Sequence, residues 1–100
     1  LALRVDTDAN LGAAISNYGA AIPTVFYGTM ISGVYKIPAL ALAVRGIMTN
    51  TVPTDAYRGA GRPEATYLIE RLADLAAEVA GIDRIEIRRR KLARANSFSS

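Results

Sequence analysis

The residues that could do chemistry gather in one glycine-rich turn, written AYRGAGRPE. Gly59 and Gly61 allow the backbone to take positive φ angles and to come within contact distance of a ligand. Arg58 and Arg62 place a fixed positive charge on either side of the turn. Pro63 suits the start of a helix, whose first N–H groups have no partner within the helix. The turn is therefore a candidate cradle for the anionic or polar edge of a cofactor.

An ordinary surface turn is the competing interpretation of the same residues. Glycine pairs at this spacing are frequent in turns that bind nothing. In that interpretation the two arginines pair with Asp55 or Glu64 at the protein surface, where such pairs contribute little. The spacing of the residues alone leaves both interpretations open.

The rest of the chain offers no complete catalytic constellation. It contains no histidine and no cysteine, which excludes Ser–His and Cys–His machinery, disulfides and ordinary zinc sites. Asp6 and Asp8 share a strand face beside a basic residue, and Glu70 and Asp74 have the i, i+4 spacing of a solvated helix face. We therefore predict no catalytic residue and no metal ligand within these 100 residues.

The elements that position the turn can be predicted from the hydrophobic pattern. Residues 1–8 alternate as a half-buried strand does, and residues 34–48 favour extended structure. Residues 13–31 predict a short helix on either side of Pro23. A turn and a bulge are expected at glycine-containing positions, Asn10–Gly12 and Gly46. The order of strands, glycine-rich loop and two helices predicts an α+β fold.

Residues 63–80 have the clearest helical pattern. Apolar residues at i, i+3, i+4 and i+7 form one stripe, made of Leu68, Ile69, Leu72, Leu75, Ala76 and Val79. The opposite side of this helix carries Glu70, Asp74 and Ala77. Gly81 is a suitable residue to end the helix. Asp83 and Glu86 have capping-box spacing and predict a second helix at 84–93.

The charge pattern raises two other classes of function. The net charge is +3, and half of the 12 basic residues lie in 84–94. A small basic module that binds nucleic acid through this helix is the alternative function, but Ile85, Ile87 and Leu92 interrupt the run and favour a solvated helix face. Residues 11–35 carry no charge, but glycine, proline and polar residues break any apolar run of bilayer length, so we expect no membrane span.

The AYRGAGRPE string, with TN upstream and an amphipathic helix after it, resembles the molybdopterin-binding large subunit of the xanthine oxidase family of molybdenum hydroxylases. Within that family it is most similar to the large subunits of aerobic carbon monoxide dehydrogenase, form II. The resemblance covers essentially the whole chain, from 5–8 through GVYKIPALAL to IDRIEIRRRKL. It implies that residues 1–100 are an internal fragment of one molybdopterin-binding domain, with no complete domain boundary.

The resemblance also implies roles for four residues of the turn. It makes Arg58, Gly59, Ala60 and Gly61 cofactor-binding residues and places Ala60 in the substrate pocket, where relatives often carry a phenylalanine. Gly59 stands where form I carbon monoxide dehydrogenases carry a copper-binding cysteine. The family's catalytic glutamate lies far downstream, outside this chain.

An oxidoreductase that hydroxylates a small substrate with oxygen from water is the implied activity. The implied cofactor is molybdopterin, in its cytosine dinucleotide form, with molybdenum. The implied partners are an iron–sulfur small subunit and a medium subunit that carries FAD, in a cytoplasmic complex or one peripheral to the inner membrane face. Because Gly59 offers no thiolate, we expect an aldehyde or a heterocycle to be preferred over carbon monoxide.

Overall fold

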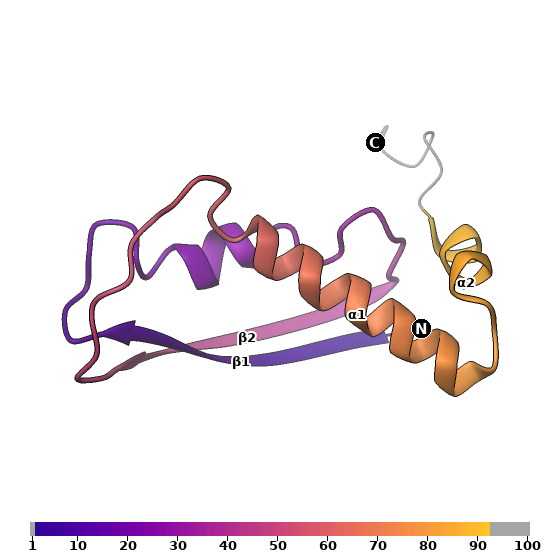
Figure 1. The fold of residues 1–100 in the computed structure, drawn as a ribbon, viewed down its shortest axis with the longest axis horizontal. Helices are drawn as coiled ribbons and strands as arrows, with labels where there is room; N and C mark the ends of the chain where they lie inside the picture. The colour runs from indigo at the N-terminus through magenta and orange to yellow at the C-terminus, as the bar shows by residue number, and fades with distance from the viewer. Residues whose placement is uncertain (1, 93–100) are drawn as a thin grey trace.

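The computed structural model describes residues 2–92 and confirms the α+β fold. Two strands come first, with a short helix between them, and a glycine-containing loop then leads to two helices (Figure 1). In chain order the elements are strand β1 (Ala2–Gly12), the π-helix η1 (Ile22–Phe26), strand β2 (Ala39–Met48), helix α1 (Arg62–Ala80) and helix α2 (Arg84–Lys91).

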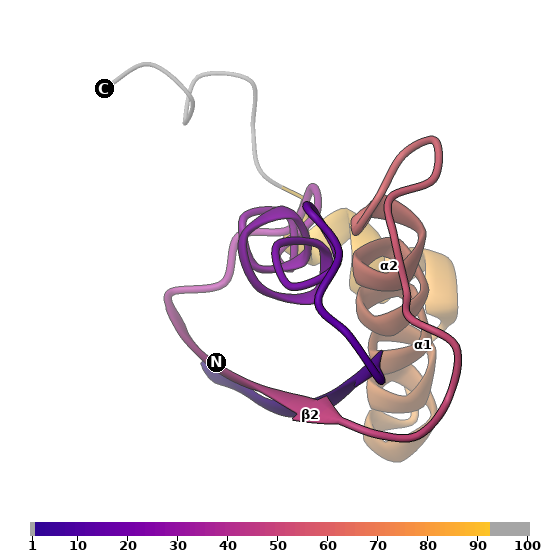
Figure 2. The same cartoon turned by 90° about the vertical axis from the view of Figure 1, so that its left-hand side faces the viewer.

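The two strands pair in parallel, from Ala2 opposite Ala39 to Ala9 opposite Gly46. Parallel neighbours need a crossover of a dozen or more residues, and residues 13–38 supply it. Figures 1 and 2 show that η1 and α1 lie side by side over the same face of this sheet. The two helical elements therefore form one layer and the sheet the other.

The core lies between these layers. Its buried residues come from β1, the segment after η1 and the first turn of α1, and they are Val5, Tyr27, Ile31 and Ala65. In β1 the basic and acidic side chains Arg4, Asp6 and Asp8 are exposed while the alternate positions point inward. The predicted alternation of this strand is thus confirmed.

The turn predicted at residues 10–12 is wrong, because β1 continues to Gly12. Asn10 stabilises the strand end: its Oδ1 accepts hydrogen bonds from the Gly12 N–H at 2.9 Å and the Thr49 hydroxyl at 2.7 Å. The bulge predicted at Gly46 is also wrong, since this residue sits in regular register. A Cβ there would come 2.8 Å from Leu11 Cδ1, so the glycine makes room for a core side chain instead.

The structure places one helical element, not two, around Pro23. Helix η1 begins at Ile22, so Pro23 lies in its first turn. Proline is tolerated there because the N–H that it lacks would have no acceptor within the helix. Extended structure also begins later than predicted, at Ala39, because the chain still turns before Pro38.

Helix α1 follows the predicted bounds to within one residue, but its buried face differs from the prediction. Leu75 and Val79 are 47% and 89% exposed. Ala77, predicted on the opposite side, is fully buried. The physical reason is that α2 packs against the polar side of α1, which carries Glu70 and Asp74. That side was predicted to face solvent.

This revised face leads to a prediction about stability. Ile69 is 7% exposed, so Ile69→Ala should lower the free energy of unfolding of the full-length protein by about 2–5 kcal/mol. Leu75→Ala is the matched control on the same helix and should have a much smaller effect. Thermal melts of both variants test the assignment. A larger loss for the Leu75 variant would mean that another part of the protein covers that face.

None of the helices described between residues 2 and 92 is both long enough and apolar enough to cross a membrane.

Candidate functional site

The glycine-rich loop turns tightly before α1. Gly59 and Gly61 have φ angles of 80° and 83°. The Ala60 N–H donates to the Tyr57 carbonyl at 3.0 Å, and the Arg62 N–H donates to the Gly59 carbonyl at 2.8 Å. Residues with a Cβ rarely adopt such φ angles, so both glycines are required by the backbone itself.

The two glycines differ in what surrounds them. A Cβ on Gly61 would lie 2.6 Å from the Tyr27 nitrogen and 2.7 Å from the Phe26 carbonyl carbon, so this glycine lets the loop pack against the end of η1. A Cβ on Gly59 would meet only the Pro63 Cδ, at 4.0 Å. Nothing in the described chain fills the space at Gly59. Its backbone is therefore the part of the loop that a ligand can approach.

Fewer backbone donors are free at the helix start than the sequence predicted. The helix begins at Arg62 and not at Pro63, with Gly61 as its N-cap and no side-chain cap. The Arg62 N–H is already bonded to the Gly59 carbonyl, and Pro63 has no N–H. A ligand at this loop must therefore be held mainly by side chains and by the exposed backbone at Gly59.

A concave depression lies beside the loop. One wall is the loop itself, residues 56–60 together with Arg62. The other wall comes from the segment around η1, more than 25 residues earlier in the chain, and consists of Tyr18, Phe26, Thr29 and Met30. This second wall could not be predicted from the sequence, because no local pattern indicates which distant segment packs against a turn.

The structure places the predicted site residues on this depression or under it. Arg58 and Gly59 are exposed, Ala60 is half-buried and Gly61 is buried. Within residues 2–92 neither Arg58 nor Arg62 forms an ion pair, so the surface pairs of the competing interpretation do not form. The Asp55 carboxylate instead accepts a hydrogen bond from the Ala56 N–H at 2.7 Å.

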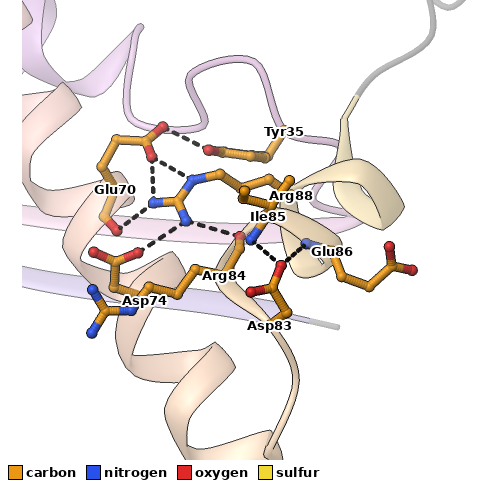
Figure 3. Close-up of polar contacts among 8 residues, drawn as sticks. All are labelled: Tyr35, Glu70, Asp74, Asp83, Arg84, Ile85, Glu86 and Arg88. Atoms are coloured by element: carbon orange, nitrogen blue, oxygen red, sulfur yellow. Dashed lines mark hydrogen bonds and ion pairs between the residues drawn. The ribbon is translucent and has the colours of Figure 1, made fainter.

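A second polar cluster lies beside the middle of α1, centred on Arg88 of α2 (Figure 3). Its Nε and Nη2 donate to Glu70 Oε2 at 2.9 and 2.7 Å, and its Nη1 lies 2.9 Å from Asp74 Oδ1. The Tyr35 hydroxyl donates to Glu70 Oε1 at 2.6 Å. Hydrogen bonds between two charged groups are stronger than those between neutral groups. The cluster therefore fixes α2 and the segment before β2 onto α1.

This geometry shifts the pKa values of the cluster. The hydrogen bond from Tyr35 holds the pKa of the Glu70 carboxyl below its ordinary value of 4.5; partial burial works against this shift, and Arg88 adds to it. The Arg88 hydrogen bond also lowers the pKa of Asp74. Burial, together with the bond to Glu70, raises the pKa of the Tyr35 hydroxyl.

A pH prediction follows from these shifts. A carboxyl whose pKa is depressed by folding stabilises the native state above its unfolded-state pKa, and this stabilisation is lost as the pH falls through the folded-state value. We therefore expect the melting temperature of the full-length protein to decrease when the pH is lowered below about 4.5. Glu70→Gln should be less stable than wild type near neutral pH, and the difference should narrow in acid. Calorimetry across this range would refute the assignment if the gap stayed constant.

The same contacts change the interpretation of the basic run. Arg88, predicted on a solvated face, is instead held by α1, and Arg90 pairs with Glu86 at 2.8 Å. Arg84, Arg89 and Lys91 remain exposed, and Arg94 lies outside the described residues. Fewer cations are therefore available to bind the phosphate backbone of a nucleic acid than the sequence suggested. This weakens the alternative function of nucleic-acid binding.

The part of the chain that the structure describes contains no group of three or more His, Cys, Asp or Glu side chains placed to hold a metal ion.

Residues 1–92 match the model of the molybdopterin cofactor-binding domain family. The chain belongs to this family. It is 39% identical over 103 residues to the carbon monoxide dehydrogenase large chain of Hydrogenophaga pseudoflava, an alignment that covers 98% of this chain and 12% of that protein. It is 40% identical over 63 residues to subunit gamma of the 6-hydroxypseudooxynicotine dehydrogenase complex of Paenarthrobacter nicotinovorans, covering 63% of this chain and 8% of the relative.

The solved structure of quinoline 2-oxidoreductase from Pseudomonas putida 86 has a similar fold. Its TM-score is 0.86 at 31% identity, over 100% of this chain and 13% of that one. These similarities confirm the resemblance to the molybdenum-binding large subunits of the xanthine oxidase family. This molybdopterin-binding chain spans only about a tenth of the length of such relatives.

Proposed function

We propose that this molybdopterin-binding chain supplies one wall of the cofactor and substrate site in the large subunit of a molybdenum hydroxylase. The observation that carries the proposal is the open backbone at Gly59 beside Arg58, which forms no ion pair within residues 2–92. A glycine with open space around it, next to an exposed cation, suits a polar, anionic ligand that approaches the main chain closely. The loop therefore fits a phosphate-bearing pterin.

Each residue of the loop has its own part in this proposal. Arg58 donates hydrogen bonds to the pterin or its phosphate, and Gly59 lets the cofactor edge approach the backbone. Gly61 contributes to cofactor binding by packing the loop against η1 and so holding the neighbouring backbone in place. Ala60 lies at the depression and borders the substrate. When bound, the molybdenum cofactor supplies the two-electron oxidation that converts a substrate C–H bond to C–OH with oxygen from water.

The wider assembly is proposed from the same family membership. A pterin that holds its metal through its own sulfur atoms needs no thiolate or imidazole from this chain, which has none to offer. We expect the cytosine dinucleotide form of the cofactor, an iron–sulfur small subunit and a medium subunit with FAD, in the cytoplasm. Relatives named as subunits or chains support a multi-subunit enzyme.

The substrate prediction follows from Gly59. Copper beside molybdenum would need a soft thiolate ligand, and this chain has no cysteine. Although the loop resembles that of carbon monoxide dehydrogenase form II, we expect the purified holoenzyme to contain no stoichiometric copper. It should oxidise an aldehyde or a heterocycle faster than carbon monoxide with an artificial electron acceptor. Stoichiometric copper together with rapid carbon monoxide turnover would contradict this assignment.

A further inference from the structure

The depression beside the loop has two chemically different walls. The loop wall carries the exposed cations Arg58 and Arg62. The opposite wall, from the η1 segment, is largely apolar and includes Phe26 and Met30. A flat ring with a hydrogen-bond acceptor on one edge matches both walls, because its face can lie against apolar atoms while its edge points toward Arg62, which leaves Arg58 to the cofactor.

Phe26 is the residue of the apolar wall that lies directly against the loop at Gly61. Its Cβ lies 2.9 Å from where a Cβ on Gly61 would be, so its side chain starts beside the loop. Its N–H donates to the Ala21 carbonyl at 3.1 Å, the widened bonding of a π-helix, a feature that often marks functional sites. The next residue, Tyr27, is 7% exposed and anchors the segment in the core, whereas Phe26 stays 39% exposed.

If the substrate is a ring, the presence of Ala60 in the loop means that a stacking surface must come from the opposite, apolar wall. Alanine has no aromatic face to offer from the loop side, and Ala60 borders the same depression as Phe26. An aromatic side chain from the facing segment can provide the missing stacking surface. Phe26 is better suited to this than Tyr57, which is 88% exposed and unsupported.

We propose that Phe26 is a specificity-determining residue, which stacks against a planar heteroaromatic substrate and so selects it over a small aliphatic one. This inference rests on the proposed function, since it assumes that the depression beside Ala60 receives the substrate.

The test compares Phe26→Leu with wild type in the purified holoenzyme, using quinoline and acetaldehyde as probes. Loss of the ring should lower kcat/KM for quinoline by about three- to tenfold, mainly through KM, because an aromatic pair stabilises the bound ring by a corresponding amount. The acetaldehyde value should change by less than about twofold. Phe26→Trp, which keeps a ring, should retain the preference for quinoline.

Val25→Ala is the matched control, because Val25 is an exposed neighbour on η1 that does not line the depression. Molybdenum content is measured on every preparation. An equal loss for both probes, an unchanged preference in Phe26→Leu, or a fall in its molybdenum content would overturn the inference. So would a wild-type enzyme that carries molybdenum and oxidises acetaldehyde but not quinoline. A wild-type preparation without molybdenum would instead contradict the proposed function itself.

Discussion

Arg58→Ala should lower both the molybdenum content and the turnover of the full-length enzyme by roughly ten- to a hundredfold, the loss expected for removal of charge-assisted hydrogen bonds to a ligand. The side chain is exposed at the depression and forms no ion pair within residues 2–92, so its charge is free to bind a ligand. Molybdenum per large subunit, measured by mass spectrometry, is the readout.

Two comparisons separate a cofactor contact from a general effect of charge. Arg71→Ala removes an equal charge from an exposed position on α1 and should leave the molybdenum content unchanged. Arg58→Lys keeps the charge but loses the planar fork of donors, so it should fall between wild type and alanine. If Arg58→Ala loaded molybdenum as fully as Arg71→Ala does, Arg58 would not be a cofactor residue.

A loss of stability as large as that of Ile69→Ala is expected from Gly61→Ala. The new Cβ would collide with backbone atoms of Phe26 and Tyr27, none of which can move without displacing η1. Together with the positive φ of 83°, this should cost about 2–5 kcal/mol of the free energy of unfolding. Urea unfolding of the cofactor-free large subunit measures it.

Gly59→Ala is the matched control for that prediction. It has nearly the same φ but open space around the new methyl group, so it should cost only about 1–2 kcal/mol. Gly59→Ala should also lower the molybdenum content by more than its loss of stability explains, because the methyl group occupies the surface that a ligand approaches. Equal destabilisation by the two alanines would show that η1 does not pack on Gly61 as described.

The parts of the fold that could be predicted from the sequence are those that depend on local patterns. The period of 3.6 residues fixed α1 to within one residue, alternation identified β1, and the Asp83 cap marked the start of α2, where its carboxylate accepts from the Ile85 and Glu86 N–H groups. The glycine-rich turn was found for the same reason. Glycine and proline restrict the backbone wherever they stand.

The features that could not be predicted depend on contacts between distant segments. Arg88 looks like one of several solvated cations in the sequence, and only the return of α2 shows that it binds Glu70 and Asp74. Phe26 lies more than 30 residues before the loop it faces, and nothing in its own neighbourhood indicates that contact. The same holds for Gly46, whose role depends on the Leu11 side chain across the sheet.

Cofactor analysis of the full-length protein purified from its host tests whether the loop from Arg58 to Gly61 belongs to a molybdenum-cofactor site. We predict close to one molybdenum and one pterin per large subunit in wild type, about as much in Arg71→Ala, and a large deficit in Arg58→Ala. Wild-type protein that is folded and joined to its partner subunits but free of molybdenum and pterin would show that the loop does not belong to such a site.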